Sequence, residues 1–306
     1  MKILITGGAG FIASHIQDAY LKLGHQVAVL DNLLSGTKQN LNAKGAFYEV
    51  DIRSPQVKEV FEDFKPEVIS HHAAQMDVRK SVADPVYDCQ VNGIGTLNLL
   101  ENAREFGVKK VVFASSGGAI YGEQEKFPAD ENHSMNPASP YGITKLLGEK
   151  YLRFYQDTYG IDAVALRYGN VYGPRQNPHG EAGVVAIFIT KLLKGEIPTI
   201  NGDGLQTRDY VFVEDVVQAN ELALGTEVKG IFNVGTGVET NVVEIYESIA
   251  KTLGNPKPAT HGPAKAGEQK RSVISFAKIQ KDLSWTPKFS LAEGIKRTVQ
   301  FFQSKV

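Results

Sequence analysis

The first half of the chain alternates short apolar runs with helical patterns. The runs are rich in valine, isoleucine and leucine and are largely unbroken by polar alternation, as expected of parallel strands covered on both faces. Six runs are predicted to be strands: 2–6, 26–31, 46–51, 67–74, 110–116 and 162–168. Helices are predicted between most of them, at 10–23, 55–64, 84–107 and 140–159. This alternation predicts an α/β fold built on a Rossmann-type, doubly wound parallel sheet.

The pattern changes after about residue 170, where prolines and glycines interrupt the chain. A helix predicted at 184–194 is followed by short strand-like pieces and turn clusters. The segments 208–224 and 230–235 are expected to return to the first sheet. We therefore predict a Rossmann domain at 1–170, rejoined by 208–235, and a smaller C-terminal lobe formed by 171–207 and 236–306.

The composition excludes several classes of protein. Of the 306 residues, 42% are hydrophobic and 22% charged, which fits a soluble globular protein with a substantial core. The formal net charge of −1 gives no reason to expect a nucleic-acid partner. The N-terminal apolar run is too short for a signal peptide or a membrane span, so no membrane partner is expected. Cys89 is the single cysteine, which excludes an internal disulfide and makes a reducing cytoplasm the expected location.

A glycine-rich turn, ITGGAGFIASHI, directly follows the first predicted strand and opens a helix. Gly7 and Gly10 have the spacing of a dinucleotide-binding turn, in which the backbone approaches a pyrophosphate that faces the helix N-terminus. Ala13 stands where a third glycine is often found and still permits close packing of the helix on the strand. The alternative is an ordinary glycine-rich turn between a strand and a helix.

Two acidic residues end the second and third predicted strands. Asp31 can accept hydrogen bonds from an adenosine ribose and would repel a 2′-phosphate, and no arginine directly follows it. These features favour NAD over NADP as the cofactor. Asp51 is placed to meet the adenine edge; the alternative is a helix N-cap before Ser54 and Pro55.

The stretch SPYGITK contains a tyrosine four residues before a lysine. Ser139 is a plausible N-cap and Pro140 a plausible first helical residue, which places Lys145 beside Tyr141 on one helix face. A nearby ammonium favours the phenolate, and so does the positive charge of an oxidised nicotinamide, so we expect either of them to lower the pKa of Tyr141 toward that of a working general base. The alternative is a core tyrosine that happens to have a lysine nearby.

The strand predicted at 110–116 ends in two serines at the carboxyl edge of the sheet, where ligands bind in such folds. Ser116 could hydrogen-bond a substrate hydroxyl and relay its proton. The alternative is a serine that only caps or turns the chain.

Ten motifs in one order carry a resemblance over nearly the whole chain: TGGAGFI, DNLLSG, HHAAQ, VNGIGTLNLL, SSGGAIYGE, SPYGITK, RYGNVYGPR, GDGLQTRDYVFVEDV, FNVGTG and LSWTPKFSLAEGI. The chain resembles the extended short-chain dehydrogenase/reductase family. Within that family it is most similar to the UDP-glucose 4-epimerases, which are also called UDP-galactose 4-epimerases.

The resemblance implies a set of site residues. Ser116, Tyr141 and Lys145 match the catalytic residues; anchoring the alignment on Tyr121 would instead put Gly117 at the hydroxyl position, and we prefer to anchor it on the strand. The cofactor residues would be Gly7, Gly10, Phe11, Ile12, Asp31, Asn32, Asp51, Ile52, Ala73, Ala74, Asn92, Tyr141, Lys145 and Tyr168. The substrate residues would be Ser116, Tyr141, Asn170, Val184, Thr199, Asn201, Arg208, Lys265 and Glu268.

The implied reaction interconverts UDP-glucose and UDP-galactose through a 4-keto sugar, with tightly bound NAD and with Tyr141 moving the proton. The residues after Ser116, from Gly117 to Ala119, carry no acid or base, unlike the dehydratases and decarboxylases of the family. This favours epimerisation over those reactions. The alternatives are a nucleotide-sugar dehydrogenase or reductase of the same superfamily, and a non-catalytic nucleotide-binding protein on this fold.

Further expectations follow from the resemblance. The nucleotide clamp of the family reads Lys265-Ala-Gly-Glu268 here, which keeps the charge but loses the arginine fork. Ser272 matches the position of a bulky residue that, in these epimerases, excludes 2-N-acetyl sugars from the sugar pocket. Because serine is small, UDP-N-acetylhexosamines are also expected as substrates. Helices 84–107 and 140–159 resemble those that pair across a two-fold axis, which predicts a homodimer. No metal is expected, because the adjacent His71 and His72 face opposite sides of a strand.

Overall fold

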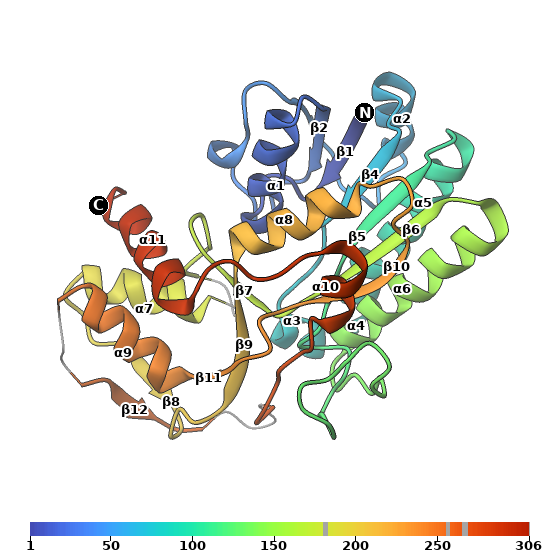
Figure 1. Ribbon diagram of the computed structural model, residues 1–306. Coiled ribbons are helices and arrows are strands. Elements are labelled where there is room, and N and C mark those ends of the chain that lie inside the picture. The colour runs from blue at the N-terminus through green and yellow to red at the C-terminus, as the bar shows by residue number, and fades with distance from the viewer. Residues whose placement is uncertain (180–182, 255–257, 265–268, 306) are drawn as a thin grey trace.

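Two lobes are joined in the computed structural model, which describes residues 1–179, 183–254, 258–264 and 269–305 (Figure 1). The first lobe contains a seven-stranded sheet in the order β10-β6-β5-β4-β1-β2-β3, and every neighbouring pair in it is parallel. Its strands are β1 (Lys2–Thr6), β2 (Gln26–Asp31), β3 (Ala46–Glu49), β4 (Val68–His71), β5 (Lys110–Ser116), β6 (Asp162–Tyr168) and β10 (Gly230–Val234). This confirms the predicted Rossmann-type sheet. The order of connection reverses between β1 and β4, and ligands bind beyond the carboxyl ends of the strands at such a switch point.

Helices cover both faces of this sheet, which explains its unbroken apolar strands. Alternate residues of β1 show the division, since Ile3 and Ile5 belong to one core cluster and Leu4 to another. One face packs against α1 (Phe11–Lys22) and α8 (Val213–Ala223). The other packs against α2 (Val57–Phe64), α5 (Gly95–Glu105) and α6 (Pro140–Tyr159).

The second lobe has its own core, formed around Phe188, Phe212, Tyr246, Ile295 and their neighbours. Its helices are α7 (Val184–Leu193), α9 (Val242–Thr252) and α11 (Leu291–Gln303), while α10 (Ala277–Leu283) packs beside β10. Two small sheets complete it, in the orders β11-β9-β7 and β12-β8. Their strands are β7 (Asn170–Tyr172), β8 (Thr199–Asn201), β9 (Thr207–Phe212), β11 (Glu239–Asn241) and β12 (Thr260–Gly262).

One expectation about the return of the chain is wrong in part. The strand in 208–224, β9, pairs with β7 and β11 and not with the first sheet, whereas α8 packs on α1 and β10 pairs with β6 as expected. The reason is that β9 serves two cores: Val211 is buried in the first lobe, and Tyr210 and Phe212 in the second. The division into two domains stays a prediction.

The region 84–107 is not one continuous helix. It consists of α4 (Pro85–Cys89), a π-helical turn η2 (Gln90–Ile94) and α5. A short helix, α3 (Val78–Ala83), precedes it and is capped by the side chain of Asp77. The remaining short element of the first lobe is the 3₁₀ turn η1 (Lys38–Asn40). In the described parts of the chain, no helix is both long and apolar enough to cross a membrane.

Candidate active site

The glycine-rich turn lies at the switch point between β1 and β4. Gly7 has a φ of +71°, and its backbone N–H donates to the carbonyl of Leu30 (2.8 Å). A Cβ on Gly7 would come within 2.7 Å of the backbone nitrogen of Ala73, so only glycine fits here. Gly10 is the N-cap of α1 and supplies no side-chain cap, which leaves the first N–H groups of that helix available to an anion. The turn therefore fits the pyrophosphate of NAD, and the helix it opens begins with Phe11 and Ile12.

Asp31 lies at the end of β2, where the resemblance places the ribose contact. Its two carboxylate oxygens accept the backbone N–H groups of Ala9 (3.0 Å) and Leu33 (2.8 Å). Burial raises the pKa of Asp31, and these two hydrogen bonds oppose the rise. The carboxylate thus joins the end of β2 to the glycine-rich turn.

Asp51 lies beyond β3, because the strand ends two residues earlier, at Glu49. Its carboxylate pairs with Arg53 (2.8 Å) and accepts from the side chain of the exposed Asn32 (2.8 Å). The hydrogen bond from Arg53 is the main reason that the pKa of Asp51 is lowered. Ile52 is buried under Gly95 of α5. Asn32 and Asp51 therefore lie together beyond the ends of β2 and β3, whereas the Ile52 side chain belongs to the core.

The helix that carries Tyr141 begins as predicted. Ser139 caps it by accepting the N–H of Gly142 (3.2 Å), and Pro140 is its first residue. Lys145 is 4% exposed and donates to the carbonyl of Ala114 (2.9 Å) on β5. Its ammonium lies 5.8 Å from the centre of the Tyr141 ring. Ser116 is the last residue of β5, and its contact with the Tyr141 phenol acts to lower the pKa of that phenol. The structure thus brings the three candidate catalytic residues together at the carboxyl edge of the sheet.

The expected direction of the Tyr141 shift is wrong for the protein alone. Burial raises the pKa of Tyr141 to about 12, although the hydrogen bond with Ser116 acts to lower it. Burial also lowers the pKa of Lys145 to about 8. Desolvation disfavours the charged form of each group. This effect is larger than that of a neighbouring ammonium, which the helical spacing had led us to expect.

The other residues predicted to bind the cofactor are held by internal contacts. The Tyr168 hydroxyl contacts the side chains of Asn220 (2.8 Å) and His72 (3.2 Å). Asn92 is buried in the π turn, where its side-chain oxygen accepts the N–H of Gln75 and its amide donates to the Gln75 carbonyl. Ala73 and Ala74 follow β4, and Ala73 borders Gly7.

The candidate substrate residues other than Ser116 and Tyr141 belong to the second lobe. Asn170 and Arg208 are on the adjacent strands β7 and β9, and Asn170 lies close to Gly118, in the loop after Ser116. Val184 is the first residue of α7, and the exposed Thr199 and half-buried Asn201 are on β8. Lys265 and Glu268 lie outside the described residues.

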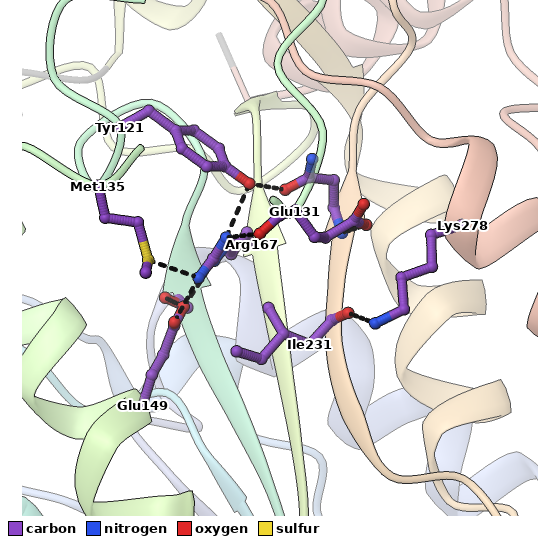
Figure 2. A network of polar contacts seen from close by, with 9 residues as sticks. Tyr121, Glu131, Met135, Glu149, Arg167, Ile231 and Lys278 are labelled. Atoms are coloured by element: carbon purple, nitrogen blue, oxygen red, sulfur yellow. Dashed lines mark hydrogen bonds and ion pairs between the residues drawn. The ribbon is translucent and has the colours of Figure 1, made fainter. Parts of the chain in front are cut away.

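A buried polar network beneath the loop after Ser116 was missed in the sequence. Figure 2 shows Glu149, Tyr121 and Met135 converging on the guanidinium of Arg167. Arg167 donates to both oxygens of Glu149 (2.7 and 2.9 Å), and the two side chains are 1% and 2% exposed. Arg167 also donates to the Tyr121 hydroxyl (2.8 Å).

The network follows from strand register. Ser115, Arg167 and Asn233 are aligned on β5, β6 and β10, so their side chains lie on one face of the sheet. The Ser115 hydroxyl donates to Glu149 (2.6 Å), and the Tyr121 hydroxyl donates to Asn233 (2.7 Å). The network therefore fixes the chain on both sides of Ser116, at Ser115 and at Tyr121. The sequence feature that could have indicated this network was the arginine inside the apolar run DAVALRY.

Comparison with known proteins agrees with this geometry. The model of the NAD dependent epimerase/dehydratase family matches residues 3–235. A UDP-glucose 4-epimerase of Mycolicibacterium smegmatis is 47% identical over 100% of this chain and 99% of its own length. Two crystal structures of UDP-glucose 4-epimerases superpose with a TM-score of 0.96. One, from Thermotoga maritima with UDP-glucose, is 46% identical over 100% of this chain and 99% of its own. The other, from Thermus thermophilus with NAD, is 47% identical over 100% of both chains.

The first prediction concerns the buried Arg167–Glu149 pair. Removing one partner of such a pair leaves an uncompensated charge, so Glu149→Gln should lower the free energy of unfolding by about 3 kcal/mol. Asp157→Asn is the matched control, because it breaks an exposed pair with Arg153 on the same helix and should change stability little. Urea denaturation measures both variants; equal losses would contradict the prediction.

Proposed function

We propose that this chain, which belongs to the NAD dependent epimerase/dehydratase family, interconverts UDP-glucose and UDP-galactose at C4 through a 4-keto sugar. The observation that carries the proposal is the meeting of Ser116, Tyr141 and Lys145 at the same carboxyl edge of the sheet as the glycine-rich turn. In this assignment the first lobe holds NAD and the second holds the nucleotide of the substrate. Gly7, Gly10 and Asp31 are the main residues on the cofactor side.

The protein residues manage one proton. Tyr141 removes the proton from the C4 hydroxyl and later returns it, while Ser116 acts to lower the pKa of the phenol. Bound NAD supplies a hydride acceptor and, when oxidised, a positive charge that favours the phenolate. Such a charge is needed, because burial alone keeps the pKa of Tyr141 at about 12. Lys145, when protonated, adds a second positive charge below the ring.

The loop after Ser116 favours simple oxidation and return. Gly117 and Gly118 have no side chain, and a Cβ at Gly117 would come within 2.7 Å of Ile274, so neither position supplies an acid or a base. Eliminating water from the sugar would require both. A net nucleotide-sugar dehydrogenase remains the second candidate, because it would use the same serine, tyrosine and lysine.

Turnover of UDP-galactose without added cofactor separates the two. We expect UDP-glucose to form with no net NADH, and nicotinamide dinucleotide to be released when the protein is denatured. Tyr141→Phe should lower the rate by about 100-fold or more, since general acid–base catalysis contributes at least that much. Tyr159→Phe, at the exposed far end of the same helix, is the matched control. Stoichiometric NADH would favour the dehydrogenase, and full activity of Tyr141→Phe would reject the proposed site.

We further propose that UDP-N-acetylhexosamines are accepted. Ser272 is small and buried, and its backbone N–H donates to the carbonyl of Thr207 (3.2 Å), which places it between β9 and the loop after Ser116. Ser272→Tyr should lower kcat/KM for UDP-GlcNAc by about 10-fold or more while sparing UDP-glucose, because a pocket that excludes one group discriminates by that amount. Failure of the wild-type protein to convert UDP-GlcNAc where it converts UDP-glucose would contradict this.

We also propose a homodimer formed through α4, η2 and α6. Large apolar side chains are exposed on these three neighbouring elements: Val86 (66%), Ile94 (55%), Ile143 (54%) and Phe154 (50%). Exposed apolar surface of this kind marks protein interfaces. Sedimentation should give a dimer for the wild type and a monomer for Ile143→Asp; a wild-type monomer at micromolar concentration would refute the proposal.

A cytoplasmic location remains part of the proposal. It rests on the single exposed thiol of Cys89, which suits a reducing compartment.

A further inference from the structure

Asp88 is a buried carboxylate directly below the candidate catalytic helix. Asp88 lies on α4 and is 0% exposed. Its carboxylate accepts three hydrogen bonds from neutral groups. Gln75 (2.9 Å) and Asn92 (3.1 Å) donate to one oxygen, and the Thr144 hydroxyl (2.7 Å) donates to the other. Within the described ranges, no cationic side chain forms a direct ion pair with it. An ionised carboxylate in such a place is costly unless a positive charge compensates it.

Lys145 is the matching buried cation. It directly follows Thr144 on α6, and its ammonium makes one described hydrogen bond, to the carbonyl of Ala114. Two buried charges of opposite sign therefore lie on the packed faces of α4 and α6, and neither has a direct ionic partner. The charge of Asp88 raises the pKa of Lys145 against the burial that lowers it.

The other titratable groups around Lys145 do not supply this negative charge. At the end of β4 and directly after it, burial lowers the pKa of His71 well below its usual range and that of His72 to about 4, so both are neutral. On α6, Glu149 is paired with Arg167 and Tyr141 is protonated. Two basic residues of α3, Arg79 and Lys80, are exposed to solvent, and η2 and the end of β5 carry no ionisable side chain. Among the described groups, Asp88 is the negative charge that faces the lysine.

We propose that Asp88 is a positioning residue for the reaction described above, and that its carboxylate is the counter-charge that keeps Lys145 an ammonium below Tyr141. This inference rests on the proposed function. It gives Asn92 and the π turn a role that the sequence did not show: Asn92 holds Asp88 while its own amide is fixed on the backbone of Gln75. π turns are frequent at functional sites.

The charge of Asp88 acts on both catalytic groups in the same direction. It raises the pKa of Lys145 and also that of Tyr141. Removing the charge should lower both, so the pH–activity profile moves toward acid on both of its limbs. A neighbouring charge typically shifts a pKa by about one unit or more, which sets the expected size of the change.

Asp88→Asn tests this with little change of shape. The amide oxygen can still accept from Gln75 and Asn92, and the amide nitrogen can donate to Thr144, whose hydroxyl can turn to the Tyr141 carbonyl (3.1 Å). We expect the Lys145 titration to fall from about 8 to about 7. It is read by NMR of ¹³C-methylated lysines, with Lys145→Met used to assign the signal. The pH–activity profile should move with it.

Thr144→Val is the matched control, because it removes a hydrogen bond to Asp88 but no charge. It should leave the Lys145 titration in place. A Lys145 titration that is unchanged in Asp88→Asn overturns the proposal. The NMR reading does not require activity, so it still decides the role of Asp88 if the protein fails to convert UDP-galactose.

Lys145→Met gives a second reading that needs no titration. Without the ammonium, the buried carboxylate of Asp88 is uncompensated, so Lys145→Met should lower the free energy of unfolding, and adding Asp88→Asn should restore part of the loss. A double variant whose loss equals the sum of the two single losses would overturn the proposal.

Discussion

The site depends on the burial of one ammonium under one phenol. Lys145 and Tyr141 both lose hydration, and burial favours the neutral form of each, with pKa values of about 8 and about 12. The proposed chemistry requires the opposite pair of states, an ammonium beside a phenolate. In a medium of low dielectric constant that pair attracts strongly once it is formed, although each charge alone is disfavoured. The protein alone therefore keeps Tyr141 as a neutral phenol, and the proposed reaction needs a further positive charge to ionise it.

Holding the two groups in place requires α6 to lie close to the sheet. A Cβ on Gly148 would come within 2.6 Å of the Phe113 ring, so the glycine allows the helix to approach β5. The same ring lies 4.9 Å from the ammonium of Lys145, which gains a cation–π contact in place of water. Glu149 continues this face of the helix and ties it to Arg167. Polar networks therefore anchor α6 on two sides, one to the strands and one to α4.

The first sheet could be predicted because its strands are buried on both faces, and the glycine-rich turn and the cap at Ser139 because local geometry fixes the residue types. The second lobe was harder to predict from the sequence. Alternate residues of β9 pack into two different cores, so the strand shows no simple alternation of apolar and polar residues. The sequence indicated Ser116, Tyr141 and Lys145 as candidate catalytic residues by their positions. The direction expected for the pKa of Tyr141 was wrong, because desolvation depends on tertiary packing. Asp88 and Arg167 were overlooked for the same reason: a charged residue within a helical or strand pattern does not reveal that it is buried.

The two lobes are linked where specificity and catalysis would meet. The segment around Ser272 pairs with the loop after Ser116, since Ala129 exchanges backbone hydrogen bonds with Val273 (3.0 Å) and Ser275 (2.8 Å). Asp209 of β9 is almost fully buried and accepts backbone N–H groups from Thr236, Gly237 and Ile274. A wall of the proposed sugar pocket is therefore built on the same backbone that fixes the loop after the candidate catalytic serine. Substitutions on that wall act on the position of the loop as well as on the shape of the pocket, because a close-packed interior transmits displacement.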